Sequence, residues 1–147
     1  MSERVAFIQA QRRLAVLWFA LSVLAFGTMI ALTFGGSFGG QYGKAWSWFL
    51  PYVVPTLTLI LTALFAERRQ SETTATVERF VYRLTLILSG VYLVLVILSL
   101  VLYPIARSGA GKISRMELLD LSTLWLMPVQ ALVGIALGFF FVSREQT

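Results

Sequence analysis

The sequence contains no cysteine and no histidine among its 147 residues. The first absence excludes disulfides, thiolate metal sites, iron–sulfur clusters and cysteine nucleophiles. The second removes the usual ligand of membrane b-type haem, the commonest metal ligand and the commonest general base. We therefore expect neither a metal nor a cofactor.

Charge is also scarce. Charged residues make up 13 % of the chain, hydrophobic residues 58 %, and the mean hydropathy is +0.80. A soluble domain has about 25 % charged residues. These values exclude a disordered chain, a charge-rich coiled coil and an ordinary cytosolic enzyme, and the length allows one domain. A small integral membrane protein fits them.

Four stretches carry no charge and are long enough to cross a membrane, which takes about 20 residues in a helix. All of the charged residues lie outside them, and their hydrophobic runs do not alternate as membrane strands do. The sequence predicts an all-α integral membrane protein, a single domain over 1–147, with its four transmembrane helices in two hairpins. The predicted spans are 14–34, 47–66, 84–106 and 121–142.

Lysine and arginine predict the orientation. Eight of them lie in the two tails and the second loop, against four in the first and third loops. By the positive-inside rule both termini are expected in the cytoplasm, with the protein in a bacterial inner (plasma) membrane. The same bias, with attraction to anionic headgroups, explains the pI near 10.1. The lipid bilayer is the expected partner, and nucleic acid is not.

Local patterns add detail at the span ends. Residues 1–13 are either an amphipathic helix on the membrane surface or an extension of the first span. The glycine-rich first loop lacks the G-K-[ST] of a phosphate-binding loop and reads as a flexible connection. Ser114 and Glu117 fit a capping box, so a helix is expected to begin near Arg115.

A faint internal repeat joins the two halves. The second and fourth spans share a W-x-x-P pattern, Trp48 to Pro51 and Trp125 to Pro128. This pattern favours two hairpins in the same orientation, a weak parallel tandem repeat. Coincidence is the alternative, because membrane helices share composition.

Small and polar residues at helical spacing predict the contact faces, since membrane helices associate by close packing and hydrogen bonds. Either all four stripes pack inside one bundle, or one faces a second copy. The glycines of the fourth span are the best candidate for a dimer interface, and the threonines of the second for a pore lining. Several leucines of the second span and Ile60 are expected to face lipid. The stripes are Ala15, Trp18, Ser22, Ala25 and Met29 in the first span; Pro51, Pro55, Thr58 and Thr62 in the second; Ser89, Tyr92 and Ser99 in the third; Gln130, Gly134 and Gly138 in the fourth.

Proline inside a helix frees the carbonyl four residues earlier. Here those carbonyls belong to Ser47, Pro51 and Leu124. They either bind a ligand or are satisfied by neighbouring side chains. Gln130, the amide within a span, is expected to form hydrogen bonds between helices.

The spans contain no Asp, Glu, Lys, Arg or His, which argues against proton relay and voltage sensing. No catalytic residue is predicted, and an enzyme is not expected. The leading hypothesis is a small membrane protein that acts by oligomerising, as a pore or a membrane-perturbing subunit. The alternatives are an accessory or anchor subunit of a larger complex and a transporter of small solutes. The candidates for cytoplasmic docking or headgroup contact are Arg12, Arg13, Arg68, Arg69, Arg79 and Arg83.

Overall fold

The computed structural model describes residues 4–67, 76–109 and 113–141. Four long helices dominate it, and all four are long and apolar enough to cross a membrane. The predicted fold class, an all-α membrane protein with two helical hairpins, is confirmed. The elements are β1 (Arg4–Ala6), α1 (Phe7–Phe34), α2 (Tyr42–Glu67), β2 (Thr76–Glu78), α3 (Arg79–Val101), α4 (Tyr103–Ser108) and α5 (Arg115–Phe141).

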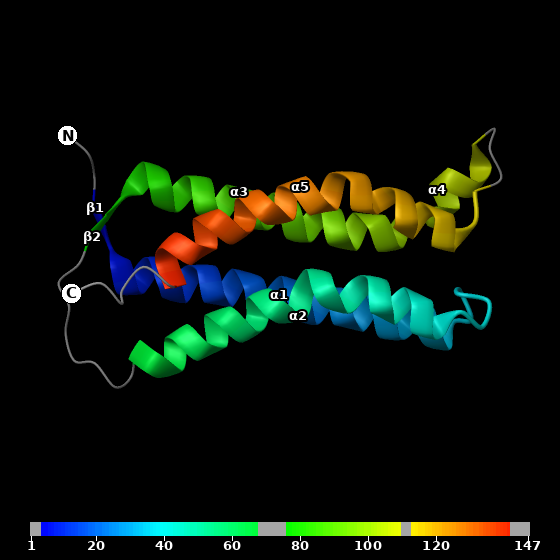
Figure 1. The fold of residues 1–147 in the computed structure, drawn as a ribbon, viewed down its shortest axis with the longest axis horizontal. Helices are drawn as coiled ribbons and strands as arrows, with labels where there is room; N and C mark the ends of the chain where they lie inside the picture. Colours follow the sequence, from blue (N-terminus) through cyan, green and yellow to red (C-terminus); the bar gives the residue numbers. More distant parts are fainter. Residues whose placement is uncertain (1–3, 68–75, 110–112, 142–147) are drawn as a thin grey trace.

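The long helices form one bundle in the cyclic order α1, α2, α5, α3 (Figure 1). α1 and α3 run in the same direction, and α2 and α5 return beside them. The start of β1 and the end of α5 lie at the same end of the bundle. Four long helices thus lie between the start of β1 and the end of α5.

A short antiparallel ribbon, which was not expected from the sequence, joins the starts of the two hairpins. β1 pairs with β2 through Arg4 and Glu78, Val5 and Val77, and Ala6 and Thr76. Each strand leads directly into a long helix, α1 or α3. Three residues are too few to show an alternating pattern, so the ribbon leaves no sequence signal.

The bundle interior is filled by large side chains. The largest fully buried ones include Trp18, Tyr92, Phe49, Phe140 and Met29. Aromatic rings meet between helices, with Trp18 and Tyr92 centroids 5.8 Å apart. These side chains fill the interior at close-packed density, as in other folded proteins.

A second, smaller cluster closes the ribbon end. Phe7, Ala10 and Leu14 of α1 pack with Tyr82 of α3 and Phe140 of α5. Residues 7–13, just before the first predicted span, are thus part of α1, and one side of this segment is buried in the bundle. The extension of the first span is the alternative that the structure supports.

The third span ends earlier than predicted. We expected it to reach Ala106, but α3 ends at Val101 and a separate short helix, α4, follows. Pro104 lies in the first turn of α4. It has no N–H to donate to the Leu100 carbonyl, so the helix cannot continue regularly across it.

The capping box is present. The backbone N–H of Glu117 donates to Ser114 Oγ at 3.2 Å, and the Ser114 N–H donates to the Glu117 carboxylate at 2.8 Å. α5 begins at Arg115, as predicted.

Candidate functional site

The stripes of α1 and α3 lie inside the bundle. In α1 the five predicted stripe residues are all buried, and in α3 Ser89, Tyr92 and Ser99 are buried as well. Small side chains such as Ala25 and Ser89 let these two parallel helices approach closely. These stripes are therefore used within one copy of the chain.

A set of hydrogen bonds crosses the middle of the bundle. The Tyr92 hydroxyl donates to the Tyr52 carbonyl at 2.8 Å, and the Tyr52 hydroxyl donates to Thr123 Oγ1 at 3.3 Å. Gln130 Nε2 donates to the Pro51 carbonyl at 3.2 Å. Together they join α3 to α2 and α2 to α5.

The Gln130 contact has a specific cause. Pro55 lacks an N–H, so it leaves the Pro51 carbonyl without its helical donor. An unpaired carbonyl is costly in hydrocarbon, and the Gln130 amide of the neighbouring helix donates the missing hydrogen bond. The amide is thus used between helices, as the sequence analysis expected.

The stripe of α2, in contrast, lies on the outer surface. Pro51, Pro55, Thr58 and Thr62 are all exposed. The Thr58 hydroxyl donates to the Val54 carbonyl of its own helix at 2.9 Å. The expectation that Ile60 faces lipid is wrong, because it is fully buried. The bulky aromatic and β-branched side chains of α2 fill the interior and turn its proline and threonine side outward.

The glycines of α5 are also outside. Gly134 is exposed and Gly138 half-buried. A Cβ atom built on either glycine would meet no neighbouring atom within 4 Å. Packing within one bundle therefore places no demand for glycine at these two positions.

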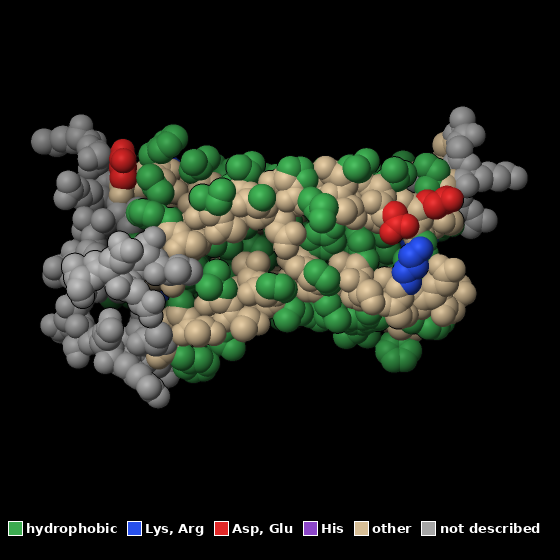
Figure 2. Space-filling view, viewed as in Figure 1, with side chains coloured by type: hydrophobic (Ala, Val, Ile, Leu, Met, Phe, Trp, Pro, Cys, Tyr) green, Lys and Arg blue, Asp and Glu red, His purple; other side chains and the backbone are tan. Residues whose placement is uncertain are grey.

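The two outer stripes flank the same seam. α2 and α5 are neighbours in the bundle, and the bond from Gln130 to Pro51 joins them at that seam. In Figure 2, viewed onto these helices, tan bands of backbone and non-hydrophobic side chains run along both. We name this surface the α2–α5 face and define it by Pro51, Pro55, Thr58, Thr62, Gly134 and Gly138.

On the face shown in Figure 2, a basic side chain (blue) lies beside acidic ones (red) at the bundle end away from the ribbon, and acidic atoms also lie at the ribbon end. Lys44 Nζ lies 3.7 Å from the Asp120 carboxylate, and both side chains are well exposed. An ion pair of this kind adds little stability. Among the described residues, no three potential metal-ligating side chains cluster together.

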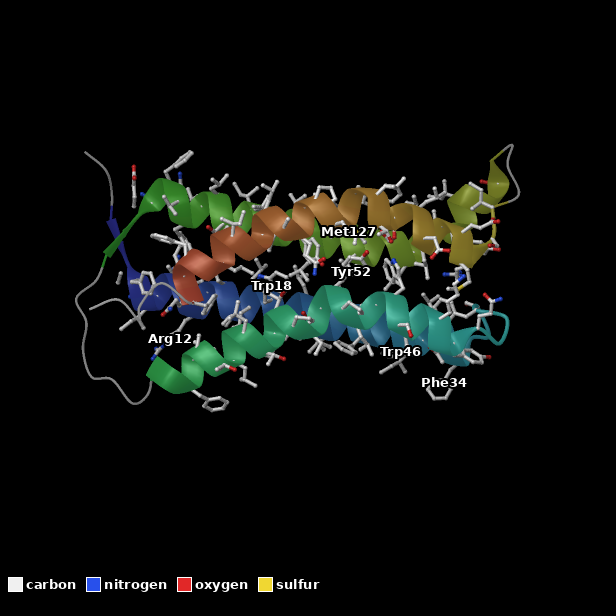
Figure 3. The ribbon with its side chains drawn as sticks, viewed as in Figure 1. Arg12, Trp18, Phe34, Trp46, Tyr52 and Met127 are labelled. Atoms are coloured by element: carbon white, nitrogen blue, oxygen red, sulfur yellow. The ribbon has the colours of Figure 1, made fainter. Side chains whose placement is uncertain are left out.

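The predicted basic residues gather at the ribbon end. Arg12 and Arg13 lie in the first turns of α1, and Arg79 and Arg83 in the first turns of α3; all four are exposed. Figure 3 labels Arg12 at this end of the bundle. The other two candidates, Arg68 and Arg69, lie outside the described residues.

One side chain with several contacts was missed. Arg115 Nη1 donates to the Leu100 carbonyl at 3.0 Å, and its guanidinium carbon lies 4.4 Å from the centre of the Tyr103 ring. Pro104, four residues after Leu100, was a signal that this carbonyl would need a donor.

Comparison with known proteins adds no family: no protein-family model, no curated protein and no solved structure matches the chain. The proposals below therefore depend on the residues of this chain alone.

Proposed function

We propose that this protein is a non-enzymatic membrane protein that acts by associating with copies of itself through the α2–α5 face. The observation that carries this proposal is the contrast between the helices. The small and polar stripes of α1 and α3 are buried, whereas the stripe of α2 is exposed and, on the neighbouring α5, Gly134 is exposed and Gly138 half-buried. In lipid, such stripes are where helices pack against one another.

The two glycines of α5 favour close contact with another helix. Gly134 and Gly138 repeat at a spacing of four, which allows the backbone of another helix to approach closely. Glycine lowers helix stability by roughly 1 kcal/mol relative to alanine. Since nothing in the bundle occupies the space beside these glycines, a second copy is the partner that benefits from them.

A conducting path, in this proposal, lies between copies. The interior of one bundle is filled by Trp18, Tyr92 and Phe49. The exposed hydroxyls of Thr58 and Thr62 lie on the face where copies meet and would line a path without fixed charge. The membrane is proposed to be a bacterial inner membrane, with both termini in the cytoplasm.

Association is tested by substituting the glycines. Gly134→Leu with Gly138→Leu is expected to convert an oligomer in mild detergent into a monomer, as measured by light scattering. Gly27→Leu is the matched control, because Gly27 of α1 also has open space beside its Cβ position. That variant is expected to stay oligomeric. A wild-type chain that is monomeric in detergent and in bilayers would contradict the proposal.

Conduction is tested in liposomes. Thr58→Leu with Thr62→Leu is expected to abolish ion leak while the oligomer persists. Thr28→Leu is the control, since Thr28 makes the same kind of bond to a carbonyl of its own helix, that of Leu24. Leak that is unchanged in the double variant would leave association without a pore. Recovery of a different protein at a fixed ratio after native extraction would favour the accessory-subunit alternative instead.

A further inference from the structure

An apolar groove runs along α1 on a different side of the bundle from the α2–α5 face. Its volume is about 630 Å³, and its lining residues are Arg12, Ala15, Val16, Phe19, Ala20, Val23 and Leu64. Leu64 is the contribution of α2, and the rest belong to α1. The groove is therefore a trough on α1, bordered by the last turns of α2.

The groove has a packing cause. Towards the bundle end away from the ribbon, α1 and α2 are held together by aromatic side chains. The Phe26 ring lies 4.9 Å from Phe49 and 6.2 Å from Trp46, whose indole N–H donates to Thr33. Towards the ribbon end the facing residues of α1 include Ala15 and Ala20, which are too small to fill the space.

The dimensions match one lipid leaflet. The lining residues of α1 run from Arg12 to Val23, a rise of about 16 Å at 1.5 Å per residue. Half of the roughly 30 Å hydrocarbon core is about 15 Å. Arg12 lies two residues before the uncharged span, so the groove extends from headgroup level to about mid-membrane.

The positive charge of Arg12 favours a lipid with an anionic headgroup. Arg12 is exposed at the mouth of the groove, and no ion pair joins it to any side chain in the described part of the chain. A guanidinium binds a phosphate with two parallel hydrogen bonds. A symmetric pair of copies meeting here would bring two Arg12 guanidinium groups to the same level of the membrane, which like-charge repulsion opposes.

We propose that this groove binds one glycerophospholipid of net negative charge, with an acyl chain along Val16, Ala20 and Val23 and the phosphate on Arg12. The ligand comes from the leaflet at the ribbon end. The site is separate from the α2–α5 face, so it stands whether or not the chain oligomerises.

The proposal is tested on the purified full-length chain by native mass spectrometry, with dioleoyl phosphatidylglycerol as the probe. One tightly bound lipid per chain is expected. Arg12→Gln is expected to weaken its binding about tenfold, because a charge-assisted hydrogen bond is lost. The matched control is Arg13→Gln, an exposed arginine that does not line the groove, with a change of less than twofold expected. Equal losses in the two variants would overturn the site in favour of general attraction to the surface.

A second variant tests the groove itself. Ala20 is exposed and lines the trough, so Ala20→Phe is expected to displace the tight lipid while circular dichroism shows unchanged helicity. Retention of the lipid would overturn the proposal, as would equally tight binding of dioleoyl phosphatidylcholine. Efficient crosslinking of Val16→Cys to a second copy would assign the groove to a protein contact instead.

Discussion

Two prolines each leave a backbone carbonyl without its helical donor, and a side chain from another helix supplies the missing hydrogen bond. Pro55 frees the carbonyl of Pro51, and Pro104 frees that of Leu100. Each carbonyl receives a donor from α5, Gln130 Nε2 in one case and Arg115 Nη1 in the other. These long polar side chains thus replace a missing backbone hydrogen bond in α2 and in α3.

Arg115 does this at the bundle end away from the ribbon. Besides its bond to the Leu100 carbonyl, its guanidinium carbon lies 4.4 Å from the Tyr103 ring centre and 5.7 Å from that of Phe38. One side chain thus fastens the first loop, α3, α4 and α5 together.

Replacing Arg115 should therefore destabilise the fold. Arg115→Met removes a charged hydrogen bond and two cation–π contacts, an expected loss of about 2 kcal/mol. The melting temperature in detergent is expected to fall by about 5 °C. Lys44→Met is the control, because its exposed ion pair with Asp120 is worth little, and its melting temperature should move by less than about 2 °C. Similar shifts in both variants would show that Arg115 does not fasten this end.

The sequence predicted part of this chemistry. Counting four residues back from Pro55 identified the Pro51 carbonyl, and Gln130 was noticed as an amide within a span. The bond between them depends on the crossing of α2 and α5, which is a three-dimensional fact. The sequence identified Arg115 only as a basic residue at the start of a helix, because its partners lie in three other segments of the chain.

At the scale of elements, the first and the second helix of a hairpin differ in which side they turn inward. α1 and α3 bury their small and polar stripes, and the sequence predicted those stripes residue by residue. α2 buries Phe49, Tyr52 and Ile60 and exposes its stripe instead. Small residues mark a contact face but do not say whether the contact lies within one copy or between two.

The Pro55–Gln130 pair offers a test between elements. Gln130→Leu leaves the Pro51 carbonyl without a donor, at an expected cost of about 1 kcal/mol in unfolding free energy. In a Pro55→Ala background, the new N–H of residue 55 can bond that carbonyl within α2. The cost of Gln130→Leu should then nearly disappear, as measured by unfolding in mixed micelles.

A distant proline supplies the control for this cycle. In a Pro104→Ala background the Pro51 carbonyl still lacks its helical donor, so Gln130→Leu should keep its full cost. Costs that are equal in all three backgrounds would show that Gln130 does not serve the proline-freed carbonyl.

At the scale of the whole molecule, the two halves follow the same plan. Each begins with a short strand, continues into a long helix and returns with a second one. The residues before α1 and α3 have nearly the same backbone angles, φ −58° and ψ 126° at Ala6 against φ −59° and ψ 130° at Glu78. This agrees with the parallel repeat predicted from the W-x-x-P pattern, and a duplication in the gene stays a prediction.

The spans were predictable because charge is excluded from hydrocarbon, so the uncharged stretches coincide with the long helices. The pairing of the two halves was not predictable from the sequence, because it depends on a three-residue ribbon and on side chains that meet across helices. The groove on α1 could not be predicted either, because it depends on how much of the α1 surface α2 covers.

The absence of cysteine makes the orientation directly measurable. The bundle places Gln41, in the first loop, at the end away from the ribbon, and Glu78 in the ribbon itself. With both termini in the cytoplasm, as the arginine distribution predicts, Gln41→Cys in intact cells should react with a membrane-impermeant maleimide. Glu78→Cys should react only after the membrane is permeabilised. Both side chains are exposed, so accessibility within the protein does not limit labelling. The reverse pattern would show that the eight basic residues of the tails and second loop face outward, against the positive-inside rule, and would place the Arg12 lipid site in the outer leaflet.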